Sequence, residues 1–348
     1  MNWLDRSHCG DCRDLMRAMA SDGVRVQTIV TSPPYWGLRS YLPDGHPDKH
    51  REIGHEPTLR EFIDTLVGVF ELARELLADD GTLWLNMGDA YAGSWGAQGR
   101  TGQMSDRSVI SAQQIAAAQH RTSGTGSRDR TGLKPKDLMG QPWRLAFALQ
   151  DAGWYLRQDI IWAKPNPMPE SVRDRCTKAH EYLFLLSKSE RYYFDADAIR
   201  TPYSGETKTQ SFDSMDYKRR DRYKSPDGWD MGAGAHGSFH RDGRQKGVLA
   251  PVDYQPKEGA NRRSVWTIPT RAYPEAHFAT FPEALVEPCV LAGSRPGDVV
   301  FDPFFGSGTT GQVAQRLGRR FLGCELNPEY EPLQRARLRQ PGLMLEVS

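Results

Sequence analysis

The chain has 348 residues, of which 38% are hydrophobic and 26% are charged, and its formal net charge at pH 7 is +1. This balance is typical of a globular protein, and a net charge so close to zero does not by itself indicate a polyanionic partner. No apolar stretch approaches the ~20 residues of a membrane-spanning helix, and the N-terminus lacks a basic-then-apolar signal pattern, so we expect a cytoplasmic protein without a membrane partner.

Short segments rich in β-branched or aromatic residues predict six strands, with helical periodicity between them. The predicted strands cover residues 26–31, 82–87, 156–162, 182–187, 299–301 and 320–325. The predicted helices cover residues 13–20, 59–77, 141–152, 282–292, 311–317 and 328–339. Continuous apolar strands that alternate with helices predict an α/β domain with a mostly parallel sheet covered on both faces.

The cysteines near the N-terminus raise the question of a metal site. Cys9 and Cys12 form a C-x-x-C pair beside His8, but a closed zinc site needs four ligands at regular spacing and the sequence has no second pair. The five cysteines of the chain are an odd, scattered set, which indicates reduced thiols. We therefore expect no metal.

The first predicted strand ends in TSPPYW, residues 31–36. Proline has no amide hydrogen to donate to a sheet, and it moves the preceding residue out of helical space. The strand must therefore stop at a stiff corner that carries two aromatic side chains.

A second corner follows the predicted strand at 299–301, in the sequence DPFFGSGTTG of residues 302–311. Its glycines allow a close approach of the backbone to a ligand, and the start of the next helix presents unpaired amides. Thr309 and Thr310 are suitable residues to cap that helix. Glu325 stands at the tip of the following strand, where the ribose diol of a nucleotide cofactor would be held.

The same corner satisfies the dinucleotide pattern G-x-G-x-x-G literally, so an NAD-dependent dehydrogenase is an alternative from another enzyme class. Asp302 argues against it, because a carboxylate at this place would repel a pyrophosphate but attract the ammonium of an amino-acid cofactor. In addition, 23 residues follow Glu325, so the remaining strands of such a domain would have to come from the N-terminal part.

The combination of TSPPYW and DPFFGSGTTG resembles the amino-methylating DNA methyltransferases that use S-adenosylmethionine. In that family an [S/D/N]-P-P-[Y/F] motif is catalytic and an F-x-G-x-G motif binds the cofactor. The order found here, with the catalytic motif first, is similar to the family's β-group permutation. The resemblance implies a Rossmann-like S-adenosylmethionine-dependent methyltransferase fold with a mostly parallel seven-stranded sheet, a circularly permuted motif order and an inserted recognition segment.

This resemblance also implies the division of the chain and its site residues. The catalytic part is residues 1–91 and the cofactor-binding part is residues 264–348, with the domain continued at 133–200, a flexible Gly-rich insert at 92–132 and a target-recognition segment at 201–263. The implied catalytic residues are Ser32, Pro33, Pro34 and Tyr35. The implied cofactor-binding residues are Asp11, Thr280, Asp302, Pro303, Phe304, Gly306, Gly308, Thr309, Thr310 and Glu325.

The resemblance implies methyl transfer to the exocyclic amine of a base flipped out of double-stranded DNA. The Ser32 hydroxyl and the Pro33 carbonyl are placed to accept the two amine hydrogens, and Tyr35 offers a face for stacking. In this family SPPY motifs favour cytosine N4 and DPPY motifs favour adenine N6, so we expect cytosine and keep adenine as the alternative. Methylation at cytosine carbon 5 needs a cysteine after a proline, and Cys289 is expected to be a buried helical thiol instead.

Partners are less determined by the sequence. A cognate restriction endonuclease is a candidate partner, and both a monomer and a dimer remain open. A catalytically silent DNA-binding module is a further alternative, which methyl transfer to DNA would exclude.

Overall fold

The computed structural model describes residues 2–37, 40–42, 45–92, 132–167, 169–202, 259–270 and 282–339. Contacts divide the chain into two units, Met1–Ile199 with Arg263–Ser348 and, separately, Arg200–Arg262. In the second unit an antiparallel bridge joins Thr201 to Ala260. Nearly all of the insert at 92–132 and of the segment at 201–263 lies outside the described residues, so the roles expected for them stay predictions.

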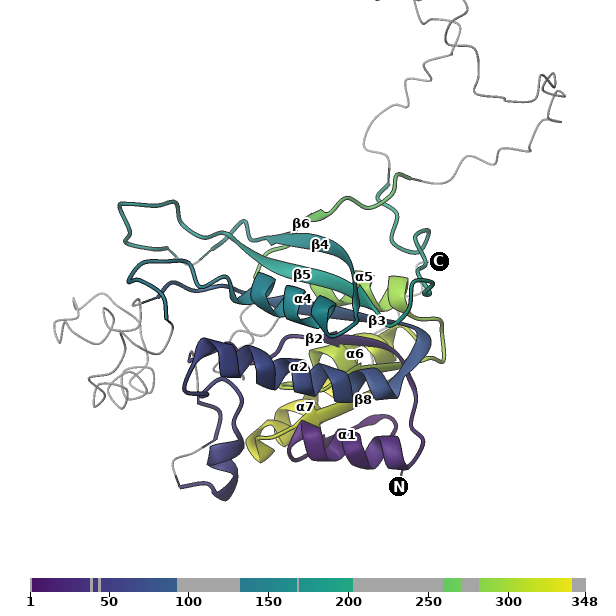
Figure 1. The fold of residues 1–348 in the computed structure, drawn as a ribbon. Coiled ribbons are helices and arrows are strands. Elements are labelled where there is room, and N and C mark those ends of the chain that lie inside the picture. Colours follow the sequence, from purple (N-terminus) through teal and green to yellow (C-terminus); the bar gives the residue numbers. More distant parts are fainter. Residues whose placement is uncertain are drawn as a thin grey trace, which may run out of the picture. The chain divides into compact units, whose positions relative to one another are not determined.

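The larger unit contains an eight-stranded sheet with helices on both faces (Figure 1). In spatial order its strands are β1 (Arg6–Cys9), β8 (Arg320–Glu325), β7 (Val299–Asp302), β2 (Val26–Thr31), β3 (Leu77–Met87), β5 (His180–Ser187), β4 (Tyr155–Ala163) and β6 (Val265–Thr267). Strand β5 is antiparallel to both of its neighbours, and every other pair is parallel. The α/β fold with a mostly parallel sheet is therefore confirmed.

The sheet has eight strands where we expected seven, and two of them escaped the sequence prediction. Strands β1 and β6 have four and three residues and lie at the two edges of the sheet. An edge strand is too short and too exposed to show a run of apolar residues. Its pairing with a neighbour is thus visible only in the folded chain.

The helices lie close to their predicted positions. They are α1 (Cys12–Ser21), α2 (Leu59–Leu76), α4 (Gln141–Asp151), α5 (Glu283–Gly293), α6 (Thr309–Arg316) and α7 (Glu331–Arg339), with short 3-10 helices η1 (Pro47–Arg51) and η5 (Pro328–Tyr330). Neighbouring strand residues such as Ile29 and Val30 belong to different hydrophobic clusters, because successive side chains point to opposite faces of a sheet. The first cluster contains α1, α2 and α4 and the second contains α5 and α6. No helix in the described ranges is long and apolar enough to span a membrane.

One edge of this sheet collects the sequence motifs. The parallel strands β1, β8, β7, β2 and β3 all end there, since the carboxyl ends of parallel strands meet at the same edge. The antiparallel strand β5 begins at this edge, and β4 ends there, because Met87 pairs with Tyr182 and Ala163 with His180. Side chains that directly follow or begin these strands therefore face one another across a single region.

Candidate functional site

A cavity of about 340 Å³ opens at this edge of the sheet. All four predicted catalytic residues line it, together with six of the predicted cofactor residues: Asp11, Pro303, Phe304, Gly306, Thr309 and Glu325. Asp302, Gly308 and Thr310 are not among its lining residues, and Thr280 lies outside the described residues. The fold thus brings the TSPPYW corner and the glycine corner to one site.

The glycine corner is held by contacts of its own backbone. Gly306 and Gly308 have φ angles of 51° and 87°, in the left-handed region that favours glycine. The Gly306 amide donates to the Glu325 carboxylate at 2.8 Å, and the Gln334 side chain donates to the Gly306 carbonyl at 2.7 Å. These bonds fix the loop before any ligand arrives.

The expected capping role of the two threonines is wrong. Helix α6 begins after Gly308, which has no side-chain capping bond. The Thr310 hydroxyl donates instead to Asp302 at 2.8 Å, and the Thr309 hydroxyl accepts a hydrogen bond from the buried Arg337. Each hydroxyl finds a tertiary partner that the local sequence does not reveal.

The third glycine of the pattern makes room for a ring. Phe305 is buried, and a Cβ atom on Gly311 would lie 2.5 Å from its Cζ atom. A Cβ atom on Gly323 of β8 would lie 2.3 Å from its Cδ2 atom. The pattern G-x-x-G therefore serves the packing of Phe305 beneath the corner.

Because of this packing, Gly323→Ala is expected to lower the free energy of unfolding by about 1–3 kcal/mol, the usual cost of overpacking a tight core. It should also weaken ligand binding at the corner, since the displaced ring supports the loop. Chemical denaturation measures the first effect. The matched control is Gly68→Ala in α2, where no atom lies within 4 Å of the added methyl group and stability should rise by up to about 1 kcal/mol. An unchanged stability of Gly323→Ala would contradict the packing argument.

Asp302 is fully buried and links three elements rather than facing the cavity. Its carboxylate accepts hydrogen bonds from Thr31 at 2.6 Å, from Thr310 at 2.8 Å and from the Phe304 amide at 3.0 Å. Burial raises its pKa to about 6 despite these donors. Asp302 is not among the residues that line the cavity. Its position therefore supports neither the expected attraction of a cofactor ammonium nor the argument that it would repel a pyrophosphate.

Glu325 does face the cavity, as predicted. Its two carboxylate oxygens accept the amides of Gly306 and Asn327, each at 2.8 Å. Burial, helped by the nearby charge of Asp302, raises its pKa to about 7 although those amides oppose the shift. No cation pairs with it among the ion pairs of the described residues, so it is an acidic acceptor that a polar ligand can use.

The two raised carboxyl pKa values predict how stability depends on pH. Between their ordinary values of 3.8 and 4.5 and their folded values of about 6 and about 7, Asp302 and Glu325 hold protons in the folded state that the unfolded chain has lost. Their contribution to stability is then present at pH 4 and lost as the pH rises through 6 and 7. Thermal unfolding of the ligand-free protein from pH 5 to 8 tests this, and Asp302→Asn should flatten the decline. An equally steep decline in that variant would contradict the assignment.

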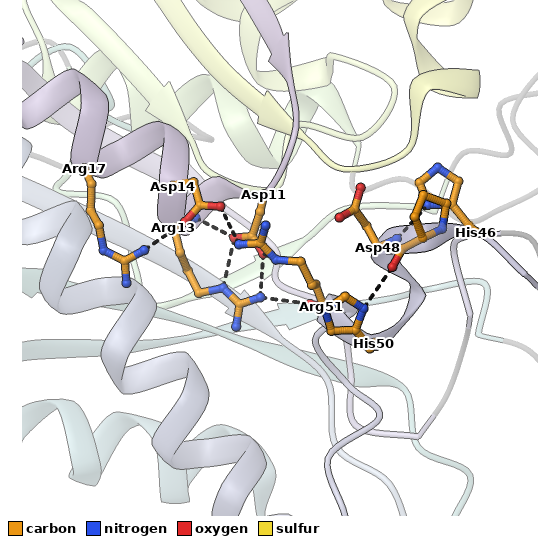
Figure 2. A network of polar contacts seen from close by, with 9 residues as sticks. Asp11, Arg13, Asp14, Arg17, His46, Asp48, His50 and Arg51 are labelled. Carbon is orange, nitrogen blue, oxygen red and sulfur yellow. Dashed lines mark hydrogen bonds and ion pairs between the residues drawn. The ribbon is translucent and has the colours of Figure 1, made fainter.

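Asp11 lies at the end of β1, where it caps α1 and lines the cavity. Its oxygens accept the Arg13 amide at 2.8 Å, Arg13 Nε at 2.9 Å and Arg13 Nη2 at 2.5 Å, and they pair with Arg51 Nε at 2.9 Å (Figure 2). Burial acts to raise the pKa of Asp11, but Arg13 and Arg51 outweigh it and hold that pKa below its usual value. With its acceptor positions filled in this way, Asp11 anchors Arg51 in the cavity wall.

The segment that carries Arg51 escaped the sequence analysis. Tyr41, Arg51, Glu52 and Ile53 all line the cavity. The buried Glu52 carboxylate accepts the Tyr41 amide at 2.7 Å, and the Tyr41 carbonyl accepts Asn327 Nδ2 at 2.9 Å. These hydrogen bonds join the segment to the end of β8 beside Glu325. No motif in its sequence predicts this contact.

The TSPPYW corner also lines the cavity, and its Tyr35 meets Glu181 of β5 there. The Tyr35 hydroxyl donates to Glu181 Oε2 at 3.0 Å, and Lys164 donates to Glu181 Oε1. Lys164 also stands over the Trp162 ring, 4.3 Å from its centroid. Glu181 was missed because it is a single acidic residue at the start of an otherwise apolar strand.

Of the cysteines considered from the sequence, Cys12 lines the cavity, whereas Cys9 and Cys289 are not among its lining residues. Cys289 is fully buried in α5 and donates to the Leu285 carbonyl, as expected of a packed thiol. Cys9 and Cys12 are free thiols, and the described part of the chain contains no cluster of metal-ligating side chains.

Comparisons with known proteins match most of the chain. A family model described as DNA methylase, of N6 and N4 methyltransferases, matches residues 26–335. The type II methyltransferase M.Cfr9I of Citrobacter freundii is 42% identical over 329 residues, which cover 94% of this chain and 86% of that protein. The type II methyltransferase M.SmaI of Serratia marcescens is 43% identical over 331 residues, which cover 94% of this chain and 89% of that protein.

Solved structures support the fold. The PvuII DNA methyltransferase, described as cytosine-N4-specific, matches with a TM-score of 0.55 at 18% identity, over 98% of this chain and 87% of that one. A DNA modification methylase of Thermus thermophilus in complex with S-adenosylmethionine matches with a TM-score of 0.50 at 22% identity, over 96% of this chain and 92% of that one. At these identities the matches show a shared fold.

Proposed function

Because this chain belongs to the family of N6 and N4 DNA methylases, we propose that it methylates the N4 amine of a cytosine flipped out of a specific double-stranded DNA site. Family membership makes the chain an S-adenosylmethionine-dependent DNA methyltransferase of the type II restriction–modification kind. It also removes the NAD-dependent dehydrogenase as an alternative. The choice of base and the roles of single residues belong to the proposal.

The observation that carries the proposal is the shared cavity. Ser32, Pro33, Glu325 and residues of the glycine corner all line it. The residues proposed to accept the amine hydrogens and those proposed to bind the methyl donor thus line one cavity of about 340 Å³, which supports the proposal. Methyl transfer needs this juxtaposition, because reacting groups must be held in line and close together.

The residues at the glycine corner fit the cofactor. Glu325 offers a carboxylate that no cation neutralises among the described residues and that two ribose hydroxyls can use. Pro303 and Phe304 supply a partly apolar wall at the corner, and the anchored Arg51 closes another side. When bound, S-adenosylmethionine supplies an electrophilic methyl group.

The chain's own residues prepare the amine. An exocyclic amine is a poor nucleophile, since its lone pair is delocalised into the ring. Ser32 Oγ and the Pro33 carbonyl accept its two hydrogens, which turns the nitrogen towards tetrahedral geometry and aims its lone pair away from them. Tyr35 stacks against the base and limits its rotation.

The preference for cytosine N4 rests on Ser32, the first residue of the SPPY motif. A hydroxyl suffices there because a methylated ammonium loses its proton readily without a strong base. Adenine N6 remains the second candidate within the family. A cognate restriction endonuclease that cuts the same site is the proposed partner, as expected of the type II methyltransferases that this chain resembles.

The deciding experiment uses the full chain, S-adenosylmethionine with a labelled methyl group, and long unmethylated double-stranded DNA of mixed sequence. Mass spectrometry of the digested nucleosides should find N4-methylcytosine. N6-methyladenine would replace the cytosine assignment, and the absence of any methylated base would overturn the proposal. A parallel NAD titration should show no binding.

A further inference from the structure

Three side chains that line the cavity form a chain of hydrogen bonds. Ser32, Tyr35 and Glu181 all line the cavity. The Tyr35 hydroxyl lies 3.0 Å from Glu181 Oε2, and the Ser32 side chain and the Gly88 amide are also within hydrogen-bonding reach of it. The chain connects the predicted acceptor for the target amine to a carboxylate 149 positions further along the sequence.

The donors and acceptors among these side chains determine the direction in which the hydrogen bonds run. An ionised carboxylate only accepts hydrogen bonds and a lysine ammonium only donates them. Glu181 accepts from Lys164 with one oxygen, so Tyr35 must donate to its other oxygen. The Tyr35 oxygen is then left as an acceptor for the Ser32 hydrogen and for the Gly88 amide.

This direction matters for the target amine, which presents N–H donors. A serine hydroxyl has one hydrogen and two lone pairs. When the hydrogen points to Tyr35, the lone pairs are what remains for the amine. If these hydrogen bonds ran the other way, Tyr35 would use one lone pair of Ser32 and the Ser32 hydrogen could point towards the amine hydrogens, so Ser32 would be a poorer acceptor.

Close packing and burial hold the hydrogen-bonded side chains in place. A Cβ atom on Gly88 would lie 2.9 Å from Tyr35 Cε2 and 3.3 Å from Glu181, so both side chains are packed closely against this glycine. The Lys164 and Glu181 side chains are only 17% and 18% exposed. Burial first, and then the charge of Glu181, raise the pKa of Tyr35 well above its ordinary value, so its hydroxyl stays protonated as a donor.

We propose that Glu181 is a positioning residue that sets the direction of the hydrogen bonds from Ser32 through Tyr35, so that Ser32 meets the target amine as an acceptor. Glu181 does not contact the amine in this proposal. Lys164 keeps it in place and forbids the opposite orientation. The inference rests on the proposed function, because it assigns the amine as the group that Ser32 receives.

The decisive variant is Glu181→Gln, which keeps the size of the side chain. Lys164 can only donate, so the glutamine oxygen must turn to Lys164 and its amide hydrogens to Tyr35. The direction of hydrogen-bond donation between Ser32 and position 181 is thereby reversed. We expect the single-turnover rate of methyl transfer to fall about 10–100-fold, the range for the loss of a hydrogen bond to a charged group.

Tyr35→Phe provides the second arm. This variant removes the hydroxyl that joins Ser32 to Glu181 and leaves the Ser32 hydroxyl free to rotate. The rate of methyl transfer should therefore fall less, by about tenfold or less. In the Tyr35→Phe background, Glu181→Gln should cause no further loss. A merely structural role of Glu181 would instead lower the rate by the same factor in both backgrounds, and that result would overturn the inference.

Controls separate folding from positioning. In both single variants the unfolding temperature should stay close to that of the wild type. The Kd for S-adenosylmethionine should stay within about twofold of the wild-type value. Glu190→Gln, at an exposed glutamate just after β5, is the matched control and should retain the wild-type rate. A Glu181→Gln variant as active as the wild type overturns the inference alone, whereas a wild-type chain that methylates no DNA overturns the proposed function with it.

Discussion

Alanine in place of Ser32 is expected to lower the rate of methyl transfer by about 10²–10³-fold, with the Kd for S-adenosylmethionine changed by less than about threefold. The loss matches that of removing one preorganised group that stabilises a reacting atom in an active site. Pro33 alone would remain to accept from the amine, so the nitrogen could turn its lone pair to several directions. Single-turnover kinetics on double-stranded DNA and a cofactor titration measure the two quantities separately.

The split between rate and affinity is the test of this role. Ser32 follows β2 and Glu325 ends β8, and β7 lies between these two strands in the sheet, so a residue that serves only the amine should leave cofactor binding intact. Ser21→Ala, at the exposed end of α1, is the matched control and should behave as the wild type. A Ser32→Ala variant with full activity, or one that has lost cofactor binding instead, would contradict the assignment.

Glu325→Gln is expected to have the opposite effect and to raise the Kd for S-adenosylmethionine about 10–100-fold. A hydrogen bond to a charged acceptor contributes about 1.5–3 kcal/mol, and the neutral amide also turns a donor towards the Gly306 or Asn327 amide. The rate at saturating cofactor should change by less than about threefold. Calorimetric titration and saturation kinetics check both values.

The pH dependence of binding distinguishes a direct contact from damage to the loop. Since the pKa of Glu325 is about 7, its carboxylate becomes protonated as the pH falls from 8 to 6, and the wild-type affinity should weaken over that interval. The Glu325→Gln variant should lack this part of the pH dependence. Glu329→Gln, on the exposed side of η5, should keep the wild-type profile. A variant that weakens binding but keeps the full pH dependence would show that another group titrates.

The sheet and its two corners were predictable because their signals are local. A β-branched run such as Val26–Thr31 with two prolines just after it predicts a buried strand that stops, and glycines between a strand and a helix mark a place of close approach. These signals located the strand ends that line the cavity, including the positions of Ser32 and Glu325. They missed β1 and β6, whose three or four residues owe their extended form to a neighbouring strand.

The same local reasoning failed where a side chain has a choice of partners. Asp302 and Thr310 were expected at the cofactor and the helix end, but they bond to each other beneath the corner. Asp11 is implied as a cofactor contact and does line the cavity, but the sequence around it does not reveal that Arg51, forty residues away, pairs with it. Nothing in the sequence close to either carboxylate distinguishes a ligand contact from a structural one.

By itself the sequence determined the class of fold, the order of the motifs and the two corners that face the cavity. The tertiary structure alone decided which polar groups meet there. Tyr35 and Glu181 are brought together because β2 and β3 run parallel while β5 runs antiparallel, so that the end of one strand and the beginning of another share an edge. Strand register is a property of the whole sheet, and for that reason the partner of Tyr35 could not be read from the residues around it.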